Sequence, residues 1–360
     1  MKYECWLSEI RMIPDRTKIK LKEELGTAKD VYYIEETVLK NMEFLKEKER
    51  KILLQAKRAE DLEKRYMAMM EKEIHLIPWG EKEYPSRLKV IYDPPYALYV
   101  KGTLPSDMQH SAAIVGAGNC TPYGEKYALE YGKKLAECGI QVISGLARGV
   151  DGTGQRGALM GGGNTFAVLG SGADICYPKN HMGLYWDILK HGGGILSELP
   201  PGTPPLPQHF PRRNRIISAL SDVVLVIEAK ERSGSLITAD LALEQGKDVY
   251  ALPGPVNSSL SQGCNRLIYQ GAGILLSPEN LLEEMGVICS IPCEKSDKNE
   301  KVLESPEYMV YSCVGLYPKS VGQLTEETKL RPEEVLKLLV SLELQGYIRE
   351  ISKNYYIKVK

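Results

Sequence analysis

The sequence lacks long apolar runs, an excess of charge of either sign, and closely spaced metal ligands. No apolar segment approaches the roughly 18 residues of a membrane span, and the first residues show no apolar signal region. The formal net charge of −1 excludes a chain that binds polyanions through overall charge, and leaves only a local basic patch. None of the eight cysteines has CxxC spacing, and no histidine lies near Cys289 and Cys293 to complete a zinc set. We therefore expect free thiols, no metal, no cofactor, no membrane contact and a cytoplasmic location.

What the sequence does contain is enough apolar material for ordinary globular domains. Of its 360 residues, 43% are hydrophobic and 26% are charged, which suits two or three domains. Apolar residues such as Val38, Met42 and Leu45 recur at helical spacing among charged ones, so residues 1–75 are predicted to form a helical module. This module is either simply solvated or binds a partner.

Residues 76–288 alternate apolar strands with amphipathic helices, a pattern typical of a doubly wound, mostly parallel α/β sheet. The predicted strands are Ala97–Val100, Ala112–Val115, Gln141–Ile143, Thr165–Leu169, Gly194–Ser197, Val223–Ile227 and Asp248–Ala251. A polar linker over 289–304 separates this domain from 305–360. That last segment has three helical stretches and a hairpin, which predict a winged helix.

Glycine and polar residues follow the predicted strands, where the ligands of such sheets bind. Glycine turns leave backbone N–H groups unpaired at a positive helix end, which favours anions such as phosphate. The candidate residues in these turns are Gly116, Gly118, Ser144, Gly145, Arg148, Gly149, Lys179, Asn180, Ser233, Gly234 and Ser235. We expect them to line one shared site.

An arginine-rich segment gives the strongest chemical signal, and we interpret it as a loop that opens a helix. It contains Arg212, Asn214 and Arg215, and guanidinium groups match phosphate oxygens in two-point contacts. With Arg148, Arg156 and Lys179 these side chains could form a basic strip that follows a polymer backbone. The alternative is that the arginines form internal ion pairs with Glu198 and Asp222. Tyr177 and Phe210 either stack on bases or fill the core.

Two enzymatic interpretations are weaker. Gly116-Ala117-Gly118 begins like a dinucleotide fingerprint, but Thr121 replaces its third glycine and no acid ends the second strand. No serine has the Gly-x-Ser-x-Gly setting of a hydrolase. Asp151 and Glu198 could form an acid/base pair, or could cap a helix and pair with an arginine.

Several of these blocks, in this order, resemble the bacterial DNA processing protein family, DprA/Smf. They are residues 144–153, 167–172, 210–217, 233–239 and 263–268, within a similar region from Tyr84 to Met285. The resemblance implies an extended Rossmann-like domain, with an N-terminal module similar to SAM or helix–hairpin–helix domains and a C-terminal winged helix. It also implies a non-catalytic protein that binds incoming single-stranded DNA during natural transformation and loads the recombinase RecA onto it.

The resemblance further implies a homodimer, with Leu267 and Ile268 in the segment similar to the family's dimer side. The chain departs from the family pattern at Gly118, where an arginine is usual, and at Gly154-Gln155, where Ala-His is usual. Arg148, Arg212 or Lys179 could replace the missing arginine.

Two alternative functions remain. One is a nucleotide hydrolase similar to the lysine-decarboxylase-like phosphoribohydrolases, in which alignment on Thr238 places Leu241 at the expected glutamate. The other is a ligand-sensing regulator that binds duplex DNA through the winged helix. Glu333 and Glu334 begin the third helix of that domain and repel a DNA backbone, so protein contact or packing is favoured there, and Lys353 and Lys358 on the wing are the better DNA contacts.

Overall fold

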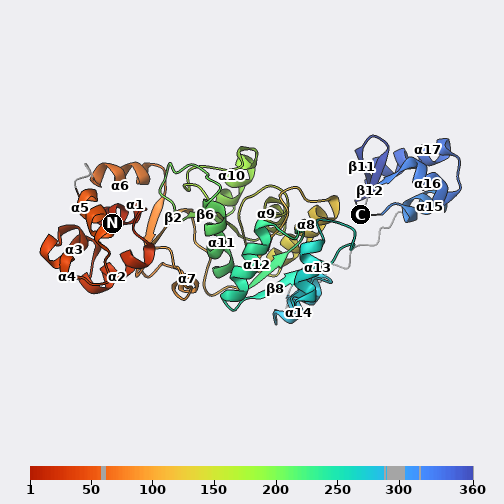
Figure 1. The fold of residues 1–360 in the computed structure, drawn as a ribbon. Coiled ribbons are helices and arrows are strands. Elements are labelled where there is room, and N and C mark those ends of the chain that lie inside the picture. Colours follow the sequence, from red (N-terminus) through yellow and green to blue (C-terminus); the bar gives the residue numbers. More distant parts are fainter. Residues whose placement is uncertain (58–61, 288, 290–304, 316–317, 360) are drawn as a thin grey trace. The chain divides into compact units, whose positions relative to one another are not determined.

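The computed structural model describes residues 1–57, 62–287, 289, 305–315 and 318–359 (Figure 1). The chain divides into two compact units, one of residues 1–119 and 127–289 and the other of residues 120–126 and 290–360. Each unit is described by itself. Among the described residues, no helix combines the length and apolar character that a bilayer crossing requires.

The predicted helical module is present and packs directly against the strands that follow it. Its helices are α1 (Lys2–Glu9), α2 (Asp15–Leu25), α3 (Ala28–Tyr33), α4 (Glu36–Asn41), α5 (Glu47–Ala56) and α6 (Leu62–Glu71). The Tyr96 hydroxyl donates a hydrogen bond to the Glu4 carboxylate, and the hydroxyls of Ser8 and Tyr99 lie 2.6 Å apart. All four side chains come from the buried contact between module and sheet, so the helices belong to the same compact unit as the sheet.

The sheet of this unit has nine strands in the order β1-β2-β6-β5-β4-β3-β7-β8-β9. They are β1 (His75–Pro78), β2 (Ala97–Gly102), β3 (Ser111–Val115), β4 (Gln141–Ser144), β5 (Thr165–Val168), β6 (Gly194–Ser197), β7 (Val223–Val226), β8 (Asp248–Ala251) and β9 (Gly273–Ile274). Strands β1 and β2 run antiparallel to their neighbours, and the others are parallel. The predicted doubly wound, mostly parallel sheet is therefore confirmed.

Helices flank the sheet, and one of them contains the arginine-rich segment. They are α7 (Ser86–Lys89), α8 (Pro122–Glu137), α9 (Val150–Met160), the short η1 (Lys179–His181), α10 (Met182–Lys190), α11 (His209–Ala219), α12 (Gly234–Glu244), α13 (Gln262–Tyr269) and α14 (Pro278–Glu284). Because α11 already begins at His209, the arginines lie on a helix and not on a loop. Successive side chains of a helix point about 100° apart, so these arginines cannot all face one ligand.

Two cysteines expected to be free thiols are paired. Cys138, just after α8, and Cys289, after α14, form a disulfide with their Cα atoms 5.0 Å apart. The two residues are separated by 151 positions in the sequence, so spacing alone could not reveal the pair. Of the other described cysteines, Cys5, Cys176, Cys264 and Cys313 are free thiols, as expected.

The C-terminal part of the second unit is a winged helix, as predicted. It contains α15 (Ser305–Cys313), β10 (Lys319–Ser320), α16 (Val321–Thr328), α17 (Pro332–Leu344), β11 (Ile348–Ser352) and β12 (Tyr355–Lys358). The strands form a sheet in the order β10-β12-β11. Its core includes Val310, Leu324, Val335 and Leu339.

An ion pair between the helical module and the loops of the sheet should make the stability of the protein depend on pH in the acidic range. Lys72 donates to Asp174 at 2.7 Å, and the Gly202 N–H donates to the same carboxylate at 2.8 Å. Burial alone would raise the pKa of Asp174, but these two donors hold it below its ordinary value of 3.8. A carboxyl whose folded pKa is lowered stabilises the protein above its unfolded pKa and loses that contribution as the pH falls further.

We therefore expect Asp174→Asn to lower the free energy of unfolding by about 1 kcal/mol or less near neutral pH, and to flatten its decline below pH ~4. Urea unfolding across the acidic range measures both effects. Lys133→Ala, which breaks the surface pair with Glu137, is the control and should leave the slope unchanged. Identical acid profiles for wild type and Asp174→Asn would contradict this account.

Candidate nucleic-acid interface

The strand order places a hollow at the point where the sheet changes winding direction. Strand β3 has β4 on one side and β7 on the other, so the connections leave β3 in opposite directions and open a crevice at the carboxyl ends. A cavity of about 480 Å³ occupies this position. It is lined by Ala117, Gly118, Asn119, Arg148, Lys230, Ser233, Ser259 and Leu260. We call it the switch-point hollow.

Its chemistry is that of an anion site. Gly118 is exposed on the turn after β3, Arg148 is exposed on the turn after β4, and Lys230 is exposed after β7. Two cations from different strands thus line a hollow that also contains a glycine turn, whose backbone a phosphate could approach closely. Of the predicted residues, Gly118, Arg148 and Ser233 line this hollow.

The glycine turns after β3 and β4 interlock. Gly149 has φ of +71°, and a Cβ there would lie 2.3 Å from the Ala117 carbonyl oxygen. A Cβ on Gly116 would lie 2.7 Å from the Val150 side chain, and the Val150 N–H donates to the Ala117 carbonyl at 3.2 Å. The two predicted glycines therefore serve mainly to bring the turns together.

A buried carboxylate lies beneath both turns. Asp151 is 7% exposed and accepts the Gly145 N–H at 3.2 Å. Burial raises the pKa of this carboxyl above its ordinary value, and the Arg213 guanidinium and hydrogen bonds from Gly145, Ser144 and Gly116 oppose that rise. Asp151 thus holds both turns from below as a structural acid, and it does not cap α9, whose N-cap is Gly149.

Arg213 completes this support from α11. Its guanidinium donates to the Gly145 carbonyl at 2.9 Å and also to the Val168 carbonyl. A Cβ on Gly145 would lie 2.6 Å from this guanidinium, so only glycine fits there. Predicted Ser144 is fully buried and donates to the Ile114 carbonyl at 2.6 Å. Gly145 and Ser144 are therefore structural residues under the interface.

Gln155, which stands where the family usually has histidine, also supports a turn. Its side-chain carbonyl accepts the Leu146 N–H at 3.2 Å, and its amide donates to the Phe166 carbonyl at 3.2 Å. Leu146 adopts φ of +55°, a conformation that this amide helps to hold. The side chain is fully buried, so the substitution keeps a structural role.

The remaining predicted residues of α11 differ in accessibility. Arg215 is buried and donates to both carboxylate oxygens of Glu198, at 3.2 and 2.7 Å, so the expected surface contact is replaced by an internal ion pair. The Asn214 amide is buried and donates to the Gly234 carbonyl at 3.3 Å. Arg212 is 47% exposed and lies 3.2 Å from Asp15 and 3.4 Å from Glu198. Asp222, the other acid considered, pairs instead with Arg87.

Other predicted residues lie around the hollow without lining it. Lys179 and Asn180 are exposed in η1, after β5. Gly234 is exposed at the start of α12, and buried Ser235 has its hydroxyl 2.8 Å from that of Ser233. The ring of half-exposed Tyr177 lies 5.6 Å from that of Phe210, which packs close to Gly170.

Sequence reasoning missed Lys230. The residue follows strand β7 and therefore obeyed the same strand-end rule as the predicted residues. The glycine turn Ser233-Gly234-Ser235, three residues further on, is the stronger local pattern in this loop.

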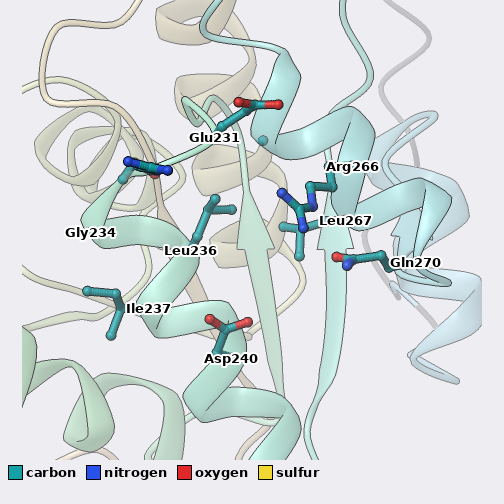
Figure 2. Close-up of a pocket in the computed structure, with 11 residues that line it drawn as sticks. Glu231, Gly234, Leu236, Ile237, Asp240, Arg266, Leu267 and Gln270 are labelled. Carbon is teal, nitrogen blue, oxygen red and sulfur yellow. The ribbon is translucent and has the colours of Figure 1, made fainter.

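A larger cavity of about 580 Å³ adjoins the hollow, and Ser233 lines both. Figure 2 shows Arg266 and Gln270 extending from α13 toward α12, which presents Leu236 and Asp240. Predicted dimer residue Leu267 is 6% exposed, and Ile268 packs against the core. Their side chains support α13 from inside.

The fold and the hollow define an extended Rossmann-type protein that has a cation-lined hollow at its switch point and also contains a winged helix. The family described as DNA recombination-mediator protein A matches residues 75–286, and the DprA winged helix domain matches residues 294–352. The chain therefore belongs to the DprA/Smf family of DNA recombination mediators, which confirms the resemblance.

Individual relatives agree with this assignment. Protein Smf of Escherichia coli K12 is 40% identical over 78% of this chain and 76% of its own length. DNA processing protein DprA of Bacillus subtilis is 42% identical over 61% of this chain and 73% of its own length. The crystal structure of DprA from Streptococcus pneumoniae superposes with a TM-score of 0.68 at 33% identity, covering 79% of this chain and 98% of that one.

The different environments of Arg212 and Arg215 predict different effects on stability. Arg215→Ala should lower the free energy of unfolding by about 3–5 kcal/mol, because it leaves Glu198, with a side chain only 5% exposed, without its main partner. Arg212→Ala should cost about 1 kcal/mol or less, because its side chain is half in solvent. Denaturant unfolding of the two variants, followed by circular dichroism, measures the difference. Equal losses of stability would show that the Arg215 pair is not the stronger support.

Proposed function

We propose that this chain binds single-stranded DNA at the switch-point hollow and acts as a non-catalytic recombination mediator. The observation that carries the proposal is the meeting of exposed Arg148 and Lys230 around the exposed Gly118 turn. Backbone N–H groups and the two cations would hold phosphates without selecting a base sequence. A solved relative supports the nucleic-acid class: the DNA processing protein A of Helicobacter pylori, described by its single-stranded DNA binding mode, has a TM-score of 0.53 at 30% identity and covers 59% of this chain and 97% of its own.

The same hollow contains side chains that can replace the arginine which the family usually carries at the position of Gly118. Gly118 leaves room at the β3 turn, and Arg148 and Lys230 enter the hollow from the neighbouring strands. They can supply the positive charge that the usual arginine would bring. Arg212 and Lys179 do not line the hollow, and we assign the replacement to Arg148 and Lys230.

A binding role also fits the positions of the two acids once considered for catalysis. Asp151 is buried under the turns, and Glu198 is paired with Arg215. The Thr238 hydroxyl is buried and lies 3.4 Å from the Gly234 carbonyl, and Leu241 stands where the phosphoribohydrolases carry a glutamate. Neither acid is presented to a ligand in the hollow.

As a mediator, the protein would protect incoming single strands in the cytoplasm and load RecA onto them as a homodimer. The dimer surface we propose is the outer side of α13 and the edge strand β9. Tyr269 is 92% exposed there and Leu276 70% exposed, whereas Leu267 and Ile268 face the core.

Removing the two cations should weaken DNA binding and its salt dependence together. Arg148→Ala and Lys230→Ala should each reduce affinity for oligo-dT roughly tenfold, as expected for a charge-assisted phosphate contact. The double variant should lower the slope of log K against log salt by about 1.4, since each single-strand phosphate contact contributes about 0.7. Fluorescence anisotropy across salt concentrations measures both.

Arg156→Ala is the charge-matched control, because Arg156 is exposed on α9 and does not line the hollow. A wild-type affinity that does not change with salt would contradict the phosphate-binding site. Tight binding to duplex DNA that survives the double variant would instead favour a regulator working through the winged helix.

RecA loading can be tested separately. Wild-type protein should shorten the lag before RecA hydrolyses ATP on DNA coated with single-strand-binding protein, and the Arg148→Ala/Lys230→Ala variant should not. Tyr269→Ala/Leu276→Ala should lose dimers in analytical ultracentrifugation while keeping the DNA site. An unchanged lag with wild-type protein would contradict the mediator role while leaving DNA binding intact.

A further inference from the structure

A third hollow lies away from the switch point, between α2 and the segment that follows α7. It has a volume of about 480 Å³. Its lining includes the aromatic residues Phe44, Trp79 and Tyr92 and the cationic residues Arg16, Lys20 and Lys89. Glu23 is the single acid among its lining residues. We call this hollow the α2 groove.

Cations and aromatic rings are paired within the groove. The Arg16 guanidinium carbon lies 4.3 Å from the centre of the Tyr92 ring, and the Lys20 ammonium lies 4.4 Å from that of Phe44. Tyr92 is 83% exposed, so most of its ring is open to solvent. A guanidinium-backed ring at the surface is a platform on which a planar base can stack, and the nearby cations suit phosphates.

The groove connects with the edge of the sheet that carries the proposed interface. Asp15 begins α2 and contacts half-exposed Arg212 of α11, and the next residue, Arg16, already lines the groove. Arg11, just before α2, lies 2.7 Å from His209 at the start of α11. The start of α2 therefore lies against the start of α11, and the outer face of α2 leads onward into the groove.

We propose that the α2 groove is a second binding site for single-stranded DNA, which takes nucleotides beyond those held at the switch-point hollow. Its occupant is a polyanion with stackable rings, because cations outnumber acids three to one in the lining and three aromatic side chains stand among them. This inference rests on the proposed function, since the two sites would share one strand.

The test compares a short oligo-dT, long enough only for the switch-point hollow, with a long one. In the full-length protein, Tyr92→Ala should reduce affinity for the long oligonucleotide about tenfold and leave the short one unchanged. Arg16→Ala/Lys20→Ala should do the same and should also lower the salt slope for the long strand by about 1.4. Lys29→Ala/Lys48→Ala removes the same charge from exposed positions of the module outside the groove and should bind like wild type.

A direct measurement accompanies the affinities. Oligonucleotides carrying halogenated deoxyuridine, irradiated in complex with wild-type protein, should crosslink to Tyr92, Trp79 or Phe44, as mapped by mass spectrometry. Thermal unfolding should be unchanged for Tyr92→Ala, because the ring is exposed.

The outcomes separate the two proposals. If Arg148→Ala/Lys230→Ala weakens binding of both lengths while the groove variants bind like wild type and no crosslink falls in the groove, the groove proposal is overturned and the DNA site stands. If wild-type protein binds neither length, both proposals fail. If the groove binds an acidic peptide while the variants keep full DNA affinity, the groove is a protein-docking site and the proposal is equally overturned.

Discussion

The glycine turns after β3 and β4 depend on charge buried directly beneath them, where Asp151 and Arg213 supply hydrogen-bond partners for the backbone. Backbone groups under a turn need partners, because an unpaired buried N–H or C=O group costs free energy comparable to a lost hydrogen bond. Asp151 accepts from the Gly145 N–H, and Arg213 donates to the Gly145 and Val168 carbonyls. With the inner side of the turns satisfied in this way, their outer side is free to face a ligand.

This arrangement divides the conspicuous residues into supports and contacts. Gly145, Gly149, Gln155 and Arg213 hold the turns after β3 and β4 in place, and Arg215 holds Glu198 after β6. Gly118, Arg148 and Lys230 face the hollow. Arginine commonly serves as both a support and a contact in proteins. Its guanidinium can satisfy several carbonyl or carboxylate oxygens in the interior, and it can also bind phosphate at the surface.

The sequence allowed the fold to be predicted more completely than the site, and the reason is physical. Buried parallel strands are continuous apolar runs bounded by turns, so each strand from β3 to β8 was visible along the chain. Whether Arg212 and Arg215 are exposed or buried depends instead on which face of α11 each of them occupies. That assignment changes if the predicted start of the helix is wrong by one residue. Arg148 and Lys230 line the same hollow because β3 lies between β4 and β7. The disulfide depends on two residues far apart in the sequence, one after α8 and one after α14, lying close together. Strand order and distant contacts leave no local pattern.

The winged helix is less suited to bind DNA than its fold suggests. A helix that enters the major groove needs polar or basic side chains on its outer face to reach base edges and phosphates. On α17 the outer face carries one exposed cation, Lys337, beside Leu336, Val340 and Leu344, which are 39%, 52% and 84% exposed and stand four residues apart. Exposed Glu333 at the start of the helix would repel a DNA backbone. Because an exposed apolar stripe of this spacing suits a protein partner better than a phosphate backbone, the first unit is the better candidate for the DNA-binding part of the chain.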